Sequence, residues 1–284
     1  MSITYQSRFF KEEGFHTALN DLYDPNGPGY FVFPKFLSEQ NANHITNLYT
    51  QSISIRDWFK CLPSQRHLYK NCPNYYFPRN TINNYSYMHF FWNEPPDDIL
   101  YSASYQIQIL RNIIESRTPF NEFFPLHGKG MTGRSCYYRF CNTRNGSPVP
   151  MHQDYVGKNL DPKRLQATLF LSQKELDYKG QGMIFTKNNG EEIVLADEAP
   201  LGPGDLVFWR YNNAHGVRDV QSNGQQKGFI RIIYPPELIH EKPPFIFSPI
   251  NLTSYIVREI QKSPMAVKLA RKLRPYISNF GIFE

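Results

Sequence analysis

The residues best suited to chemistry in this 284-residue sequence are two histidines and an aspartate. His152 and Asp154 are separated by one residue, and His215 follows His152 by 63 positions. Residues i and i+2 of a strand point to the same face, so His152 and Asp154 can converge while Gln153 points away. Two imidazoles and a carboxylate on one face of an octahedron leave three positions open, which suits Fe(II) that binds an organic co-substrate together with O₂. We expect these three residues to be metal ligands.

A third ligand so far along the chain needs a neighbouring strand to bring it to the other two. Residues 201–210 read as a turn followed by an apolar strand, directly before His215. The β-branched and aromatic run at residues 227–234 then contains one embedded cation, Arg231. A buried guanidinium requires an anionic partner, and a carboxylate bound bidentately would be a suitable one. The spacing of His152 and Asp154 alone is a weak signal, and this ordered context strengthens it.

Several short motifs accompany the three ligands in a fixed order: Met-His-Gln-Asp-Tyr at 151–155, Thr-Leu-Phe-Leu-Ser at 168–172, Gly-Gln-Gly-Met-Ile-Phe at 180–185, Pro-Gly-Asp-Leu-Val-Phe-Trp at 203–209, His-Gly-Val at 215–217, and Arg231. This order resembles the Fe(II)/2-oxoglutarate-dependent oxygenases. The His-Gln-Asp triplet is most similar to the phytanoyl-CoA hydroxylase branch, and the Gly-Asp-Leu-Val-Phe-Trp and His-Gly motifs also resemble prolyl hydroxylases. The likeness covers residues 135–235 well and residues 28–50 loosely. It implies Fe(II), 2-oxoglutarate as co-substrate, and O₂.

The resemblance assigns the distal carboxylate of 2-oxoglutarate to a cation after the distal histidine. In the family this cation often follows that histidine more closely than Arg231 follows His215, so Lys227 competes with Arg231 for the role. The chain keeps Asp154, whereas halogenating relatives replace this carboxylate with a small residue. Hydroxylation is therefore favoured over halogenation, while desaturation and ring closure stay open. No catalytic side chain is expected beyond the metal ligands.

Six further residues are weaker candidates, because their types suit a pocket as well as ordinary packing. Tyr137 and Arg139 share one face of the strand before the ligands. Gln153 is the middle residue of the His-Gln-Asp triplet, and a tryptophan such as Trp209 more often belongs to the hydrophobic core. The candidates for co-substrate binding are Gln153, Thr168 and Tyr137, and those for substrate binding are Arg139, Tyr155 and Trp209.

The elements that must hold such a site are those of a mainly β protein with flanking helices. Short strands separated by Gly, Pro and Asn turns are typical of a sandwich or jelly roll, and aromatic residues make up 15% of the chain. We expect a single oxygenase domain over residues 1–284, with a double-stranded β-helix (jelly-roll) core at residues 135–235. Strands are expected near residues 30–33, 136–141, 167–172, 182–186, 192–195, 205–209 and 228–234.

The flanking segments are expected to be helical or irregular. Residues 1–27 lead into the run Asp-Pro-Asn-Gly-Pro-Gly at 24–29 and are interpreted as an N-terminal arm. Ser38 is a candidate N-cap for a helix that reaches about Tyr49, and a second helix is expected from Ile99 to Glu115. Residues 52–96 are expected to be loops with short strands that form a substrate lid. Residues 250–275 are expected to form basic helices.

Charge and cysteine pattern argue against several function classes. The net charge is +6, and basic residues gather in the last 34 positions, where a solvated helix surface is favoured over contact with nucleic acid or a membrane. No run approaches 18 apolar residues, and no zinc-finger spacing or phosphate-binding loop is present. We expect a cytoplasmic protein with a small-molecule partner and leave homo-oligomerisation open. The four cysteines, expected to be reduced, are Cys61, Cys72, Cys136 and Cys141.

The sequence thus predicts a 2-oxoglutarate- and O₂-dependent iron oxygenase that hydroxylates an unactivated C–H bond of a small molecule. No second domain or peptide-binding repeat is visible, which favours a specialised metabolite, with an alkaloid of the cylindrospermopsin type as one assignment. Two alternatives remain. One is a non-catalytic jelly-roll binding module, and the other is a cupin-type metalloenzyme that does not use 2-oxoglutarate.

Overall fold

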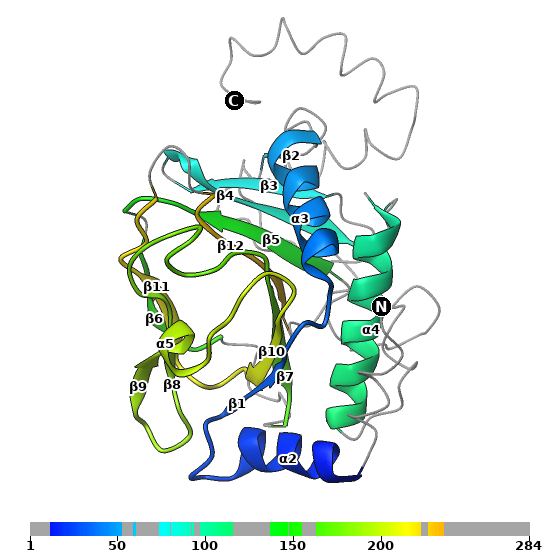
Figure 1. Cartoon of the computed structure of the whole chain (residues 1–284), viewed down its shortest axis with the longest axis vertical. Coiled ribbons are helices and arrows are strands. Elements are labelled where there is room, and N and C mark those ends of the chain that lie inside the picture. Colours follow the sequence, from blue (N-terminus) through cyan, green and yellow to red (C-terminus); the bar gives the residue numbers. More distant parts are fainter. Residues whose placement is uncertain are drawn as a thin grey trace, which may run out of the picture.

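Two β-sheets face each other in the computed structural model, which describes residues 12–52, 59–60, 74–79, 81–91, 93, 97–115, 137–146, 148–154, 163–222 and 227–235 (Figure 1). The larger sheet has the order β1 (Tyr30–Phe33), β10 (Leu206–Arg210), β7 (Leu165–Phe170), β12 (Phe229–Tyr234), β5 (Tyr137–Thr143), β4 (Thr81–Phe90), β3 (Tyr75–Arg79) and β2 (Phe59–Lys60). The smaller sheet has the order β6 (Val149–His152), β11 (His215–Arg218), β8 (Gly182–Thr186) and β9 (Glu192–Val194).

The strand pairing confirms the predicted jelly-roll class. Apart from the parallel pair β2–β3, the paired strands of the described residues are antiparallel. From β5 to β8 consecutive strands alternate between the sheets: β5 and β7 belong to the larger sheet, whereas β6 between them and β8 after them belong to the smaller one. Crossing back and forth in this way places segments distant in sequence side by side, as a double-stranded β-helix requires.

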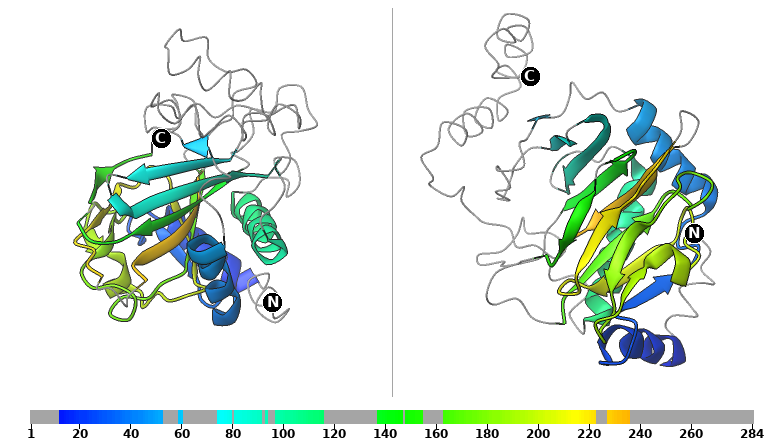
Figure 2. Two further views of the ribbon diagram at one scale, coloured as in Figure 1. Left: turned by 90° about the horizontal axis from the view of Figure 1, so that it is seen from above. Right: turned by 90° about the vertical axis from the view of Figure 1, so that its left-hand side faces the viewer.

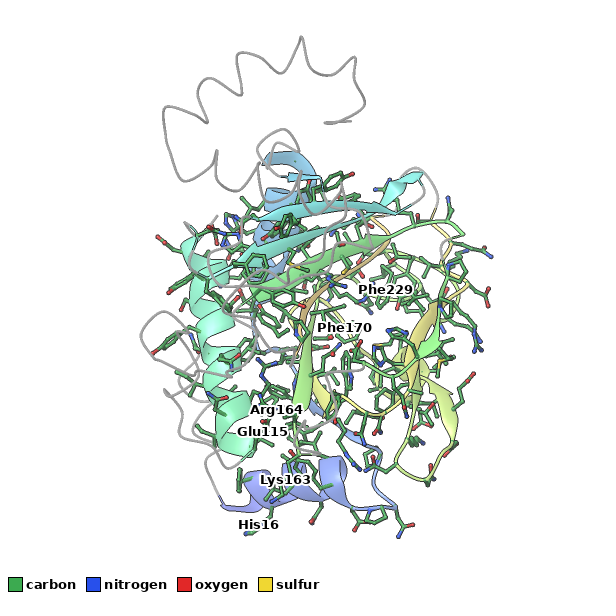
Figure 3. All side chains as sticks on the ribbon, turned by 180° about the vertical axis from the view of Figure 1, so that it is seen from behind. His16, Glu115, Lys163, Arg164, Phe170 and Phe229 are labelled. Carbon is green, nitrogen blue, oxygen red and sulfur yellow. The ribbon has the colours of Figure 1, made fainter. Side chains whose placement is uncertain are left out.

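Helices cover the outer side of the larger sheet (Figures 1 and 2). They are α2 (Glu12–Tyr23), α3 (Glu39–Asn47), the π-helix η1 (Leu48–Ser52) and α4 (Asp98–Ile114), while the short α5 (Leu195–Glu198) accompanies the smaller sheet. The predicted cap is present, since the Ser38 hydroxyl accepts from the Asn41 amide at 3.2 Å. At the start of α4 the Asp97 carboxylate accepts from the Leu100 amide at 2.9 Å and caps the helix. Just beyond α4, Glu115 accepts from the Leu165 amide at 2.7 Å, which ties the helix to the start of β7 (Figure 3).

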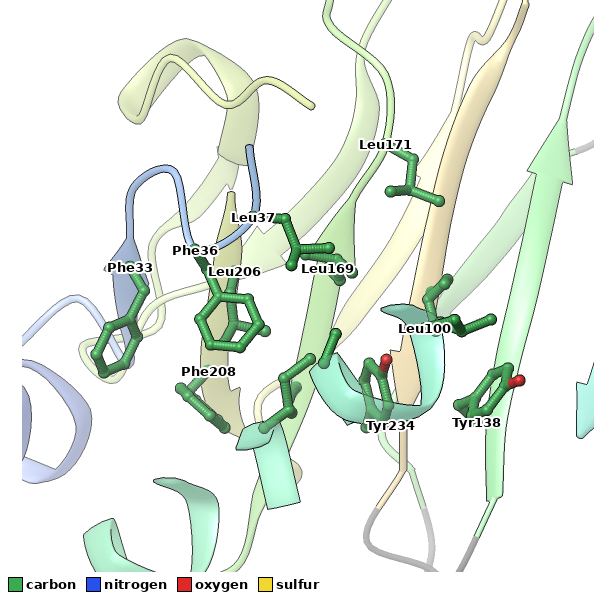
Figure 4. Close-up of a cluster of buried hydrophobic side chains, with 14 of the residues drawn as sticks. Phe33, Phe36, Leu37, Leu100, Tyr138, Leu169, Leu171, Leu206, Phe208 and Tyr234 are labelled. Carbon is green, nitrogen blue, oxygen red and sulfur yellow. The ribbon is translucent and has the colours of Figure 1, made fainter. Parts of the chain in front are cut away.

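Each strand of the larger sheet sends alternate side chains to opposite faces, which separates two clusters of buried residues. The outer cluster packs Leu169 and Tyr138 against α2, α3 and α4 (Figure 4). Ile232 belongs to the same cluster. The inner cluster packs Phe170 and Phe229 toward the smaller sheet (Figure 3). The space between the sheets is therefore lined by the residues that alternate with those of the helix-facing core.

The structure differs from the sequence expectation at residues 81–90. This segment was expected to be loops and short strands within a substrate lid, yet β4 is a ten-residue strand. It pairs with β5 from Tyr85 to Phe90. Residues 86–90 are buried without alternation, because the strand is covered on both faces, and such a strand shows no period of two in its polarity.

Other expectations concern the two ends of the chain. Residues 12–23, within the stretch interpreted as an arm, form α2, and Ala18 and Leu22 of this helix are buried in the outer cluster. The basic helices expected at residues 250–275, and the cysteines other than Cys141, lie outside the described residues. Within the described ranges, none of the helices combines the length and apolarity needed to cross a membrane.

Candidate metal centre

The smaller sheet brings His152, Asp154 and His215 together. His152 is the last residue of β6 and stands opposite His215, the first residue of β11. Asp154 lies two residues beyond the end of β6, where the chain leaves the sheet. One ligand atom from each residue lies within 4.8 Å of the other two. The Asp154 carboxylate is 3.6 Å from His152 Nε2 and 3.5 Å from His215 Nε2.

Hydrogen bonds to the backbone orient both imidazoles. The Nδ1 atom of His152 lies 2.8 Å from the Pro150 carbonyl, and Nδ1 of His215 lies 3.2 Å from the Asn213 carbonyl. A carbonyl only accepts, so each Nδ1 carries the proton and each Nε2 presents its lone pair toward Asp154. Burial lowers the pKa of His215 below its ordinary value, although the charge of Asp154 opposes this shift. The neutral imidazole that a metal requires is thereby favoured.

A chain of amide side chains supports the loop that carries His215. Asn213 donates to the Thr186 carbonyl and to Asn188 Oδ1, each at 3.0 Å. Asn188 in turn donates to the Asp24 carbonyl at 2.7 Å, just after α2. The order α2, Asn188, Asn213, His215 thus links the metal centre to the N-terminal helix. These two asparagines were not expected from the sequence to support the site, although Asn213 belongs to the Asn-Ala-His-Gly run at 213–216.

The three residues fit a transition-metal ion. Two ligands about 2.1 Å from one ion and at right angles to each other lie about 3 Å apart, so the 3.5 and 3.6 Å separations need only small side-chain shifts. Two histidines and one carboxylate are the donor set of mononuclear non-haem Fe(II) sites with open positions. The ligand types, the oriented Nε2 atoms and their convergence agree on this type of centre.

A cavity of about 70 Å³ lies between the two sheets at this centre. The smaller sheet and the end of β6 contribute the three metal ligands, and the larger sheet contributes four polar side chains from four neighbouring strands. The volume corresponds to roughly five water-sized groups, which suits a small organic molecule. The four polar residues are Arg139 on β5, Gln166 on β7, Trp209 on β10 and Arg231 on β12.

Arg231 and Lys227 take different directions. The guanidinium of Arg231 lines the cavity, lies over the Phe229 ring at 4.4 Å and donates to Thr143 Oγ1 at 3.3 Å. Its charge contributes to lowering the pKa of His215, so the two side chains are electrostatically coupled. The Lys227 ammonium instead bonds Asn43 Oδ1 at 3.0 Å on α3, away from the described cavity wall.

The weaker candidates are distributed unevenly. Arg139 and Trp209 line the cavity, and the Trp209 ring lies 5.6 Å from the His215 ring. Tyr137 and Thr168 are buried within the sheet but do not contribute to the cavity wall of the described residues. Gln153 is exposed, and Tyr155 lies outside the described residues. Gln166 was not expected at the site, and its only signal in the sequence is that it interrupts the apolar strand Leu165–Phe170.

No protein-family model and no curated protein sequence matches this chain. Among solved structures, a prolyl-4-hydroxylase of Pseudomonas putida is similar, with 12% identity, a TM-score of 0.47 and coverage of 77% of this chain and 96% of that chain. A prolyl hydroxylase of Trichoplax adhaerens in complex with a peptide fragment of hypoxia inducible factor has 12% identity, a TM-score of 0.49 and coverage of 83% of this chain and 94% of that chain. The non-haem alpha ketoglutarate dependent carbocyclase SnoK from nogalamycin biosynthesis has 13% identity, a TM-score of 0.46 and coverage of 82% of this chain and 94% of that chain. At this distance the function has to be inferred from the site residues of the chain itself.

Proposed function

We propose that this chain is an Fe(II)- and 2-oxoglutarate-dependent oxygenase that hydroxylates a C–H bond of a small molecule. The observation that carries the proposal is the shared cavity: an oriented His-Asp-His cluster on one sheet faces a buried arginine on the other. His152, Asp154 and His215 would hold the iron, which when bound activates O₂ for the oxidation. A specialised metabolite, including an alkaloid of the cylindrospermopsin type, is the proposed substrate class.

The protein's own residues supply orientation and charge. The backbone carbonyls of Pro150 and Asn213 fix the tautomers of the two histidines before any ligand arrives. Arg231 offers a guanidinium that suits the distal carboxylate of 2-oxoglutarate, because a planar guanidinium can bind a carboxylate through two parallel hydrogen bonds. The largely buried position of Arg231 strengthens such a contact by excluding water.

The proposal is tested first by co-substrate binding under argon. Fe(II) and 2-oxoglutarate added together should give the visible charge-transfer band of the chelate, and air should then yield succinate. His152→Ala should remove both signals, because one of three ligands is lost. Arg231→Ala should retain iron binding and raise the 2-oxoglutarate concentration needed for the band. The matched controls are His16→Ala at an exposed position and Arg218→Ala at a half-buried position on the same strand as His215.

The two alternatives predict other outcomes. A cupin-type metalloenzyme that does not use 2-oxoglutarate would bind Fe(II) through the same three ligands but show neither the band nor succinate. A non-catalytic binding module would not bind the metal with an affinity that depends on His152. Either result would reject the oxygenase proposal.

A further inference from the structure

Gln166 and Trp209 form a polar pair on the cavity wall that the metal centre does not use. They stand directly opposite each other on β7 and β10 and are 2% and 1% exposed. Both line the cavity. Gln166 Oε1 and Trp209 Nε1 have no hydrogen-bond partner within the part of the chain that the structure describes. We call these two residues the Gln166–Trp209 pair.

Buried polar groups of this kind are almost always satisfied in folded proteins, because leaving one unpaired in a low-dielectric interior is unfavourable. The indole N–H is only a donor, whereas the glutamine amide offers both an acceptor and a donor. Because both side chains border the cavity, a molecule inside it can approach them. The complementary molecule has an acceptor for Trp209 and a donor for Gln166.

The pair lies at a different end of the cavity from Arg231. In the register, Arg231 stands opposite Phe170, and Gln166 lies four residues from Phe170 along β7. At about 3.3 Å per residue this separates the two positions by about 13 Å along the strand. The Trp209 ring lies 5.6 Å from the ring of the metal ligand His215. A co-substrate bound between Arg231 and the metal therefore leaves the pair to a second molecule bound beside the metal.

We propose that the Gln166–Trp209 pair recognises an amide-like –CO–NH– group of the substrate, as in a lactam or a ureide. Its carbonyl accepts from Trp209 Nε1–H, and its N–H donates to Gln166 Oε1. That the bound molecule is the substrate rests on the proposed oxygenase function. The binding site itself is formed by Gln166 and Trp209 and does not depend on that function. Gln166 and Trp209 are thus specificity-determining residues, placed to hold the oxidised carbon at a fixed offset from the metal.

The test uses the indole N–H of Trp209 as a reporter in ¹H–¹⁵N NMR spectra of the full chain, both metal-free and with Zn(II) and 2-oxoglutarate. The chain has three tryptophans, and the signal absent from Trp209→Phe is that of Trp209. The probe is 2-piperidone, compared with N-methyl-2-piperidone, which has the same ring and carbonyl but no N–H. We expect saturable shifts with 2-piperidone and at least about tenfold weaker binding of the N-methyl compound.

Two variants separate recognition from folding. Gln166→Met replaces the amide with an apolar chain of similar size and should abolish the preference for 2-piperidone. Leu165→Met introduces the same residue one position earlier, on the opposite face of β7, and should leave the titration unchanged. If the native chain, like Gln166→Met, binds the two lactams with equal affinity, the proposal is wrong.

Further outcomes distinguish the proposals from each other. If 2-piperidone does not shift the indole signal of Trp209, the amide-like substrate class is rejected. If cyclopentanecarboxylate shifts the signal instead, and does so only while Arg139 is present, the amide-like class is rejected in favour of an anionic substrate. If the lactam preference is observed but Fe(II) and 2-oxoglutarate give no charge-transfer band, the subsite stands and the oxygenase function fails. The inverse result rejects the subsite and retains the oxygenase.

Discussion

The two faces of the larger sheet are made from the same strands yet differ in the state of their polar groups. On the helix face, buried hydroxyls are paired: Tyr49 donates to Tyr138 at 3.1 Å, and Ser104 lies 2.9 Å from Tyr234 Oη. On the cavity face, Gln166 and Trp209 each keep a polar atom without a partner among the described residues. These hydroxyls of the helix face are paired within the protein, whereas the two polar atoms of the cavity face are those that the proposed ligand would satisfy.

The difference shows how one sheet separates stability from chemistry. Side chains alternate with a period of two, so neighbours such as Arg231 and Ile232 serve opposite faces. A slip of one residue in the register of β12 would exchange these faces, burying the arginine under the helices. The helix-facing core therefore fixes the register on which the cavity depends.

The largest expected effect is on stability, at adjacent positions of β7. Leu169→Ala removes a fully buried side chain from the helix face and should lower the free energy of unfolding by about 3 kcal/mol. Thr168→Val deletes a hydroxyl on the cavity face that has no partner among the described residues, and should leave the stability unchanged or raise it by up to about 1 kcal/mol. Urea unfolding followed by circular dichroism measures both. Equal losses would contradict the division between the faces.

The next effect is on ligand binding, at adjacent positions of β12. Arg231→Met should weaken 2-oxoglutarate binding by about 10- to 100-fold, because a charge-assisted hydrogen-bonded contact is lost. The affinity of Arg231→Lys for 2-oxoglutarate should lie between those of Arg231→Met and the native chain, since an ammonium keeps the charge but loses the bidentate geometry. Ile232→Val, on the helix face, should cost about 1 kcal/mol of stability and leave this affinity unchanged. Anaerobic titration of the charge-transfer band gives the affinities.

An effect of similar size, on the metal and not on the co-substrate, is expected where the cavity face meets its support. Asn213→Ala removes the hydrogen bonds to Thr186 and Asn188 that hold the loop before His215. The affinity for Fe(II) should fall by about 10- to 100-fold, as is usual when groups that orient a ligand are lost. Asn189→Ala, in the exposed turn next to Asn188, is the control. An unchanged iron affinity in Asn213→Ala would show that the backbone alone orients His215.

Fold class and the proximity of His152 and Asp154 were predictable because they depend on local patterns. The strand at 182–186 and the cap at Ser38 follow from turn residues and side-chain chemistry that act within a few positions. The proximity of His152 and Asp154 follows from their spacing, although Asp154 lies beyond the end of β6 and not within the strand as expected. These features do not require knowledge of distant neighbours.

The features that the sequence could not provide depend on tertiary neighbours. Residues 81–90 contain aromatic and polar residues in an order that hides their strand, because β5 and the helices determine their burial. The choice between Arg231 and Lys227 required the position of Asn43 on α3, to which the lysine donates. Gln166 resembled an ordinary polar interruption until the register placed it opposite Trp209.

The smallest expected effect is a pH dependence that belongs to the helix face. His89 on β4 is 1% exposed, and its ring stacks on that of Tyr138 at 5.1 Å. Burial lowers the pKa of His89 to about 3. The unfolded chain, with a histidine pKa of about 6.5, then binds the proton more readily than the folded chain, so stability is complete above pH 6.5 and falls as the pH decreases toward 3.

Between pH 7.5 and pH 5.5 this single group should lower the free energy of unfolding by about 1.4 kcal/mol. His89→Phe keeps an aromatic ring in the position beside Tyr138 and should remove this part of the pH dependence, whereas His16→Phe at an exposed position should retain it. The measurement is urea unfolding of the metal-free chain at both pH values. If His89→Phe loses as much stability as the native chain, His89 does not titrate from a buried site, and the helix face is less completely closed to water than its packing indicates.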